Sequence, residues 1–424
     1  MKFHFHSYLL LFFLLSSLSS LHAQKAVLRA AQLFDAATGR MVSPAVVVID
    51  GNRIESINPA QLPKDAEVID LKDMTLLPGL IDVHVHITGN LALAQRSRTA
   101  MDSEVKETAS DRTIRGIINA ETTLKAGFTT VRDLGSGDFT AVSLARASQA
   151  GLIPAPRIIP AGYPLSITGG HGDAGGYIPG VAEGGPETGI ADGVDEVTKA
   201  VRYQIKHGAK VIKIMATAGV LSFEGPSGAQ QYTETEMRAA VEEAARHGIK
   251  VTAHAHGLEG TIAAIKAGIA SIEHGSTLDA EAIRLMKEKG TYLVPTVYIA
   301  ERINLDALPP VMRRKAEEVM PVSEKSVKEA IKSGVNIAFG TDAAIIPHGE
   351  NAKQFDVLVR MGMQPVEAIR SATIYAAKLL ETPDRGQLKA GLLADIIAVQ
   401  GNPLENVKVL EEVKFVMKDG KVYK

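Results

Sequence analysis

The chain has 424 residues, with 46 lysines and arginines against 48 aspartates and glutamates, and its formal net charge is -2 at pH 7. So small a charge offers no basic surface for a polyanion, which argues against a nucleic-acid partner. Because the chain has no cysteine, disulfides, thiol nucleophiles and Cys-ligated zinc are all excluded. Any metal must therefore be held by histidine, carboxylate or a modified side chain.

The first 23 residues have the layout of a cleaved secretory signal. Lys2 precedes an apolar stretch from Tyr8 to Leu15, and a Ser/Leu run then ends at Ala23. The apolar stretch is short for a bilayer span, although an uncleaved anchor is the alternative. The sequence therefore predicts a secreted or periplasmic protein that is cleaved near Ala23 and is not stably inserted in a membrane afterwards.

Both ends of the remaining chain carry short β-branched runs separated by turn residues. The runs are Ala26–Ala31, Ala45–Ile49, Arg53–Ile57, Glu67–Leu71, Ala394–Val399, Val413–Met417 and Lys421–Tyr423. Neither end has enough strands for a stable sheet by itself. We therefore expect one small composite β-sandwich domain built from residues 24–75 and 389–424, with residues 76–388 inserted between them.

Residues 76–388 alternate short apolar strands with helical patterns. The eight candidate strands are Leu80–Ile87, Phe128–Leu134, Arg157–Ala161, Lys210–Ala216, Lys250–His254, Ser271–His274, Thr291–Thr296 and Val335–Thr341. Clear 3.6-residue periods predict helices at Thr235–His247 and Pro365–Leu380. Alternating strands and helices imply parallel pairing, and eight strands imply an α/β fold closed into a (β/α)8 TIM barrel. The Gly-rich stretch 169–193 has no periodicity and is expected to be a long loop on the catalytic face.

His84 and His86 lie two residues apart on the first predicted barrel strand. Since side chains two apart on a strand share a face, both imidazoles point the same way. At the end of a barrel strand that face is the interior, where two imidazoles form a metal-binding pair. For an isolated pair, two histidines satisfied in a core would be an equally good interpretation.

Four more predicted strands carry chemically active residues. His254 and His274 end the fifth and sixth strands, Asp342 follows the eighth, and Lys213 lies within the otherwise apolar fourth. The carboxyl ends of barrel strands form the active site in this fold, so these residues predict a metal site there. Neutral imidazoles and a carboxylate suit Zn2+ and similar divalent ions, with one position open for water.

Lys213 does not fit a metal site as an ammonium, because burial and repulsion by the metal both disfavour its charge. A buried lysine deprotonates readily, and the neutral amine can add carbon dioxide to give a carbamate. The resulting N6-carboxylysine would be an anionic bridge between two metals. The alternative is a lysine whose stem packs in the core while its amine reaches solvent.

Several motifs together resemble the metal-dependent amidohydrolase superfamily, in particular its imidazolonepropionase-like and prolidase-like (Xaa-Pro dipeptidase-type) branch. They are LFDAATG (Leu33–Gly39), LLPGLIDVHVH (Leu76–His86), SIEHGS (Ser271–Ser276), FGTDA (Phe339–Ala343) and GLLADIIAVQGNPL (Gly391–Leu404). The resemblance covers essentially the whole chain after the signal segment. It is highly specific for the superfamily and only moderately specific for the substrate.

The resemblance implies two divalent metal ions, with Zn2+ as the expected metal. The implied ligands are His84, His86 and Asp342 for the more buried ion, His254 and His274 for the second, and carboxylated Lys213 as the bridge. A hydroxide shared by the two metals would attack the amide. Asp342 would act as general base and then general acid.

The resemblance also implies residues that face the substrate. His256 would stabilise the developing oxyanion, which makes it a second catalytic residue beside Asp342. His171 and Tyr232 resemble positions that contact substrate in dipeptidase-like relatives, although both could simply close the Gly-rich segment. His348 matches no motif.

The expected function is that of an exported amidohydrolase that cleaves the C–N amide bond of small substrates, above all dipeptides of the Xaa-Pro or Xaa-Lys/Arg type. An imidazolonepropionase-like cyclic amide hydrolase or a mononuclear deaminase is the rival, but a one-metal site has no use for a carbamate at Lys213. Detoxifying amidases of mycotoxin or carbamate type stay open, as does assembly into a homo-oligomer. A non-catalytic binding protein is disfavoured because all six metal positions are filled.

Overall fold

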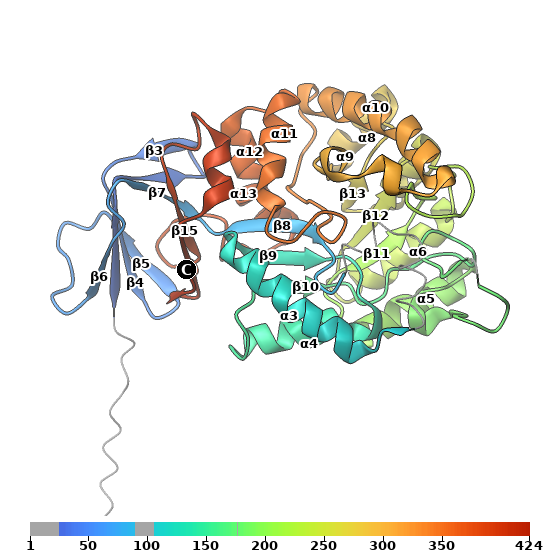
Figure 1. The fold of residues 1–424 in the computed structure, drawn as a ribbon, viewed down its shortest axis with the longest axis horizontal. Coiled ribbons are helices and arrows are strands. Elements are labelled where there is room, and N and C mark those ends of the chain that lie inside the picture. Colours follow the sequence, from blue (N-terminus) through green and yellow to red (C-terminus); the bar gives the residue numbers. More distant parts are fainter. Residues whose placement is uncertain (1–24, 90–105, 176) are drawn as a thin grey trace, which may run out of the picture.

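The computed structural model describes residues 25–89, 106–175 and 177–424. The predicted signal segment, with its cleavage point near Ala23, lies outside the described residues. Figure 1 shows a small β part beside a larger part in which helices surround strands. Among the described residues, no helix combines the length and the apolar character that a membrane crossing requires.

The small part contains two sheets that pack face to face. Its strands are β1 (Ala26–Ala30), β2 (Gln32–Asp35), β3 (Arg40–Val42), β4 (Ala45–Asp50), β5 (Arg53–Ile57), β6 (Glu67–Asp70), β7 (Met74–Pro78), β15 (Ile396–Gln400), β16 (Phe415–Lys418) and β17 (Lys421–Val422). One sheet has the order β5-β4-β1-β6, and the other has the order β17-β16-β15-β7-β2-β3. Leu28 and Val47 of the first sheet share a buried cluster with Leu76 and Ile396 of the second.

The two ends of the chain share one of these sheets. β15 pairs antiparallel with β7, with Ile397 opposite Leu77, which is the joining of ends that the sequence predicts. Strands β2, β3 and β7 are additions to the predicted set. The division of the chain at residues 75/76 and 388/389 stays a proposal, and β7 runs across the first of these limits directly into the first barrel strand.

The larger part is a ring of parallel strands. They are β8 (Leu80–Val85), β9 (Phe128–Asp133), β10 (Arg157–Pro160), β11 (Ile212–Met215), β12 (Val251–Ala255), β13 (Ser271–His274) and β14 (Tyr292–Val294). They form two parallel sheets, β10-β9-β8 and β11-β12-β13-β14. Parallel bridges join the sheets, from Leu165 to Ile214 on one side and from Leu293 to Ile337 and Val85 to Ala343 on the other. The fold is therefore the expected TIM barrel with an additional small domain.

The predicted eighth strand, Val335–Thr341, is present only as irregular backbone, so the expectation of a regular strand is wrong. The N–H groups of Thr341 and Asp342 both approach the carbonyl of His84, at 3.3 and 2.7 Å, which interrupts a regular ladder. Gly340 lies so close to β8 and β14 that an added Cβ would be 2.3 Å from Val294 Cγ1. This close approach closes the barrel and places Asp342 at its mouth.

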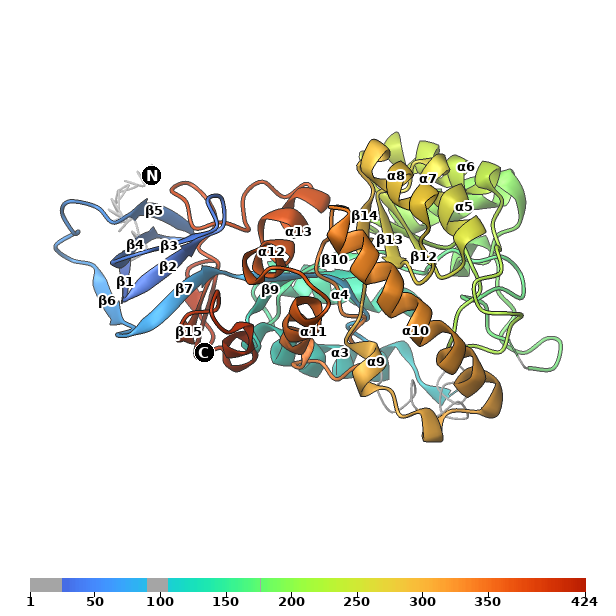
Figure 2. The same cartoon turned by 90° about the horizontal axis from the view of Figure 1, so that it is seen from above.

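Helices cover the outside of the barrel and part of its mouth (Figure 2). They are α3 (Ala109–Lys125), α4 (Thr140–Gln149), α5 (Gly193–Lys206), α6 (Glu234–Ala245), α7 (Leu258–Ala267), α8 (Ala280–Lys289), α9 (Ile299–Arg302), α10 (Pro310–Lys332), α11 (Gln354–Arg360), α12 (Pro365–Ser371) and α13 (Ile374–Leu379). Helix α6 corresponds to the predicted Thr235–His247 and begins at a capping box between Thr233 and Glu236.

The single helix predicted over Pro365–Leu380 is wrong, because α12 and α13 are separate helices. Thr373 between them has φ -131° and ψ -99°, which is outside the helical region. Its hydroxyl donates to the carbonyl of Ile369 at 2.8 Å. The backbone angles of this one residue interrupt the helix, and the 3.6-residue pattern does not reveal them.

Candidate metal centre and catalytic cavity

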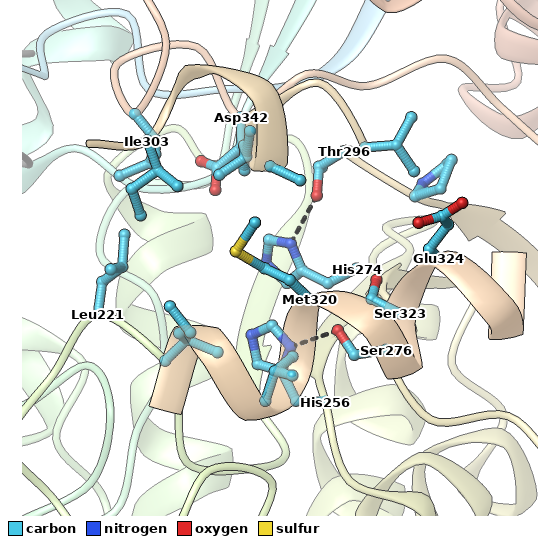
Figure 3. Close-up of a pocket in the computed structure, with 18 of the residues that line it drawn as sticks. Leu221, His256, His274, Ser276, Thr296, Ile303, Met320, Ser323, Glu324 and Asp342 are labelled. Atoms are coloured by element: carbon cyan, nitrogen blue, oxygen red, sulfur yellow. Dashed lines mark hydrogen bonds between the residues drawn. The ribbon is translucent and has the colours of Figure 1, made fainter. Parts of the chain in front are cut away.

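A cavity of about 690 Å³ lies at the carboxyl ends of the barrel strands, below α9 and α10. Histidines and Asp342 form its polar side. Apolar side chains form another part of the lining, among them Leu221, Ile303 and Met320. Figure 3 shows Met320 in front of His274, with Leu221 and Ile303 on one side of the opening.

The first group of candidate ligands consists of His84, His86 and Asp342, whose ligand atoms all lie within 4.8 Å of one another. Asp342 Oδ1 lies 3.3 Å from His86 Nε2 and 3.5 Å from His84 Nε2. Asp342 has φ 58°, a left-handed conformation that is uncommon for a residue other than glycine. This strained turn brings its carboxylate to the two imidazoles of β8.

The second group consists of His254, His256 and His274, again within 4.8 Å of one another. His274 Nδ1 lies 2.8 Å from Thr296 Oγ1, and His256 Nδ1 lies 2.7 Å from Ser276 Oγ (Figure 3). Because Nδ1 of each ring is occupied, Nε2 is the nitrogen left to the cavity. The distances between these ring nitrogens do not distinguish His256 from His254 and His274, the two predicted ligands of the second metal ion.

Glu273 is a functional candidate that the sequence analysis missed. Its Oε2 lies 2.8 Å from His84 Nδ1, so His84 presents Nε2 to Asp342. Strand alternation would turn Glu273 away from the interior that His274 faces. However, His274 has φ 70°, so both side chains reach the interior. The sequence does contain a signal for Glu273, because a carboxylate in the short strand SIEH next to a candidate metal ligand indicates a buried partner for it.

Lys213 lies in β11 with 2% of its surface exposed. Burial lowers the pKa of Lys213 to about 8, even though Glu273 and Asp342 act to raise it. Within the described residues, its Nζ takes part in no hydrogen bond or ion pair. Such an amine loses its proton more easily than an ordinary lysine, which is the condition for carbamate formation.

The donor set fits divalent cations. Within the part of the chain that the structure describes, the buried atoms Asp342 Oδ1 and His254 Nε2 have no hydrogen-bond partner. Burial lowers the pKa of both His254 and His274 well below the usual range, so both rings are neutral ligands at pH 7. Although burial acts to raise the pKa of Asp342, His84 and His86 hold it well below its usual range, so it is a carboxylate. Neutral imidazoles and carboxylate are the ligands that Zn2+ accepts.

His171 lines the cavity, and its contact with substrate stays a prediction. Its ring centroid is 4.2 Å from that of His254. Its Nδ1 lies 2.9 Å from both Ser222 Oγ and Glu224 Oε1. Among the residues that the structure describes, the other ring nitrogen, Nε2, has no hydrogen-bond partner.

The structure does not bring Tyr232 into the cavity. Its side chain is 1% exposed and packs in the barrel core. Its hydroxyl donates to the carbonyl of Ala191 at 3.0 Å, which ties down the end of the Gly-rich loop. This placement corresponds to the loop-closing alternative rather than to contact with substrate.

His348 also lies outside the cavity, on the far side of the first ligand group. Its Nδ1 is 3.0 Å from Thr123 Oγ1 and its Nε2 is 3.3 Å from the carbonyl of His86. It therefore connects α3 to the backbone of a candidate ligand.

Comparison with known proteins gives consistent relatives. The chain matches the model of the Amidohydrolase family over residues 75–423. Ochratoxinase of Aspergillus niger is 40% identical over 373 residues, which cover 82% of this chain and 75% of that protein. A crystal structure of a Xaa-Pro dipeptidase with methionine in its active site has a TM-score of 0.89 and 40% identity, and the match covers 95% of this chain and 100% of that one. A prolidase solved with N-methylphosphonate-L-proline has a TM-score of 0.84 and 33% identity, with 94% and 99% covered.

Proposed function

This chain belongs to the amidohydrolase family and is a hydrolase of amide bonds, and from that starting point we propose that it is an exported dipeptidase that works with two divalent metal ions. The observation that carries the proposal is the meeting of two ligand groups in one cavity, with Lys213 in the same lining. A single metal would need only one of these groups.

We assign the more buried ion to His84, His86 and Asp342. His254 and His274 would hold the second ion, and Lys213 as N6-carboxylysine would bridge the two; Zn2+ fits this set of nitrogen and oxygen donors. When bound, the two ions would activate a water molecule as the nucleophile and polarise the scissile carbonyl.

The chain's own residues would move the proton and bind the oxyanion. Asp342 is ionised at neutral pH and accepts the proton of the attacking water, then delivers it to the departing amine. If the hydroxyl of Ser276 donates to Nδ1 of His256, the Nε2–H of His256 is left to donate to the substrate oxygen. His171 offers Nε2 to another polar group of the substrate.

We propose dipeptides of the Xaa-Pro or Xaa-Lys/Arg type as substrates; the similarity to the Xaa-Pro dipeptidase and prolidase structures supports the first type. The second candidate is a detoxifying amidase of mycotoxin or carbamate type, as the name of ochratoxinase suggests. The apolar wall of Leu221, Ile303 and Met320, in a cavity of about 690 Å³, favours this candidate because it suits bulkier apolar groups.

The test is a screen of zinc-loaded protein against a dipeptide library and a set of bulky N-acyl amino acids. Asp342→Asn should lower kcat/KM for every substrate by about a thousandfold or more, because it removes the proton carrier. Asp65→Asn, at an exposed carboxylate, is the control and should match the wild type. Equal rates for Asp342→Asn and the wild type would remove the proposed mechanism. Sequencing the N-terminus of protein from the extracytoplasmic fraction tests export.

A further inference from the structure

The segment from Gly219 to Glu224 encloses the ring of His171. A Cβ added at Gly219 would lie 2.0 Å from His171 Cε1, so the backbone packs directly on the imidazole. The backbone N–H of Gly219 donates to Glu224 Oε1 at 2.9 Å, and the same oxygen lies 2.9 Å from His171 Nδ1. The position of the ring therefore depends on the shape of this segment.

Lys315 of α10 holds that segment from the other side. Its side chain is buried, and its Nζ donates to the carbonyls of Gly219, Ser222 and Glu224 at 3.4, 2.9 and 2.5 Å. An ammonium has three protons, and here each has a carbonyl acceptor. A buried cation is retained only where such acceptors replace water.

Apolar contacts join the same two elements. Val220 and Leu221 pack against a cluster that contains Met312 and Ala316, on either side of Lys315 in α10. Leu221 and Met320 also line the cavity, and Met320 lies beside His274 (Figure 3). Helix α10 and the segment Gly219–Glu224 therefore form one wall of the cavity.

We propose that Lys315 is a positioning residue for His171. By fixing the carbonyls of Gly219–Glu224, it keeps the Glu224 carboxylate on Nδ1 of His171 and leaves Nε2 in place for a polar group of the amide substrate. The role of His171 toward substrate rests on the proposed function. The structural coupling of Lys315 to His171 through the segment Gly219–Glu224 does not depend on the proposed function.

The first test is hydrogen exchange, which needs no substrate. Lys315→Met should speed exchange of the amides of residues 219–224, because they lose the cation that orders their carbonyls. The matched control is Lys325→Met, an exposed lysine on the same helix, which should leave that exchange unchanged. Unchanged exchange in Lys315→Met would overturn the proposal.

The second test is a double-mutant cycle with His171→Gln on the substrate found by the screen. Lys315→Met should raise KM by about tenfold with kcat and bound zinc near wild-type values, and should add nothing further in the His171→Gln background. Equal effects in both backgrounds would mean that Lys315 acts independently of His171, which overturns the proposal.

If Lys315→Met does not fold, Lys315→Gln replaces it, since this change keeps a polar side chain at the position but removes the ammonium that bonds to the three carbonyls. It should give the same rise in KM and the same lack of additivity with His171→Gln; additive effects would again contradict the proposal. If neither the wild type nor any variant hydrolyses an amide, the proposed function is wrong. The hydrogen-exchange experiment still tests whether Lys315 orders the segment that holds His171.

Discussion

Glu273 joins His84 to Arg132 beneath the candidate metal centre. One carboxylate oxygen lies 2.8 Å from His84 Nδ1, and the other lies 2.8 Å from Arg132 Nη2. All three side chains are buried. A carboxylate on the second nitrogen of a ligating histidine fixes the tautomer and the ring orientation, so Glu273 prepares His84 to bind a cation through Nε2.

Removing this charge should weaken metal binding without removing a ligand. We expect Glu273→Gln to lower the affinity for zinc by about 10- to 100-fold, measured by competition with a chelator. Glu259→Gln, at an exposed carboxylate of α7, is the control. An unchanged affinity in Glu273→Gln would show that His84 needs no such partner.

The same ion pair should matter for stability. Arg132→Met leaves the Glu273 carboxylate buried without its cation, and we expect a loss of about 3–5 kcal/mol in the free energy of unfolding in urea. Arg284→Met breaks an exposed pair with Glu288 on α8 and should cost less than about 1 kcal/mol. Similar losses for the two variants would contradict a special role for the buried pair.

The carbamate assignment leads to a rescue experiment. Lys213→Ala should lose most of its amide hydrolysis, because the bridge between the two ligand groups is gone. A short carboxylic acid such as propionate could occupy the vacated space and should restore part of the rate in a concentration-dependent way. Wild-type protein treated identically is the control. Full activity of Lys213→Ala without the acid would refute the assignment.

His348 should make the stability of the metal-free protein depend on pH. Burial lowers the pKa of His348 to about 4, against about 6.5 for an exposed imidazole. Between these values the unfolded chain binds a proton that the folded protein excludes. The full contribution of His348 to the free energy of unfolding is therefore present above about pH 6.5. It decreases as the pH drops toward 4, by about 3 kcal/mol in all.

The measurement is urea unfolding at several pH values between 7 and 4. His348→Gln should flatten the fall of stability in that window relative to the wild type. An identical slope in His348→Gln and the wild type would show that His348 gains no such protection on folding.

The sequence predicted the elements whose cause is local. The alternation of strands with helices predicts the barrel, and barrel geometry then places the strand-end residues together. The period-2 spacing of His84 and His86 puts both imidazoles on the same face of their strand. The sharing of one sheet by the two chain ends was predicted because neither end has enough strands for a sheet alone, but β7, the strand that pairs with β15, was not among the predicted strands.

The missed features depend on contacts between distant residues or on single backbone angles. Glu273 and His274 both reach the interior because the left-handed backbone of His274 breaks the strand alternation, and Thr373 separates two helices through its own non-helical backbone angles. Lys315 meets its three acceptors across 91 to 96 positions of sequence. Tyr232 was expected from resemblance alone, and the structure places it in the core.

The most direct test of the proposed catalyst is the metal content of active protein, measured by elemental analysis per chain after removal of loosely bound ions. Two ions per chain are expected, falling to about one in a His254→Ala, His274→Ala double variant. One ion per chain in fully active wild-type protein would contradict the binuclear assignment.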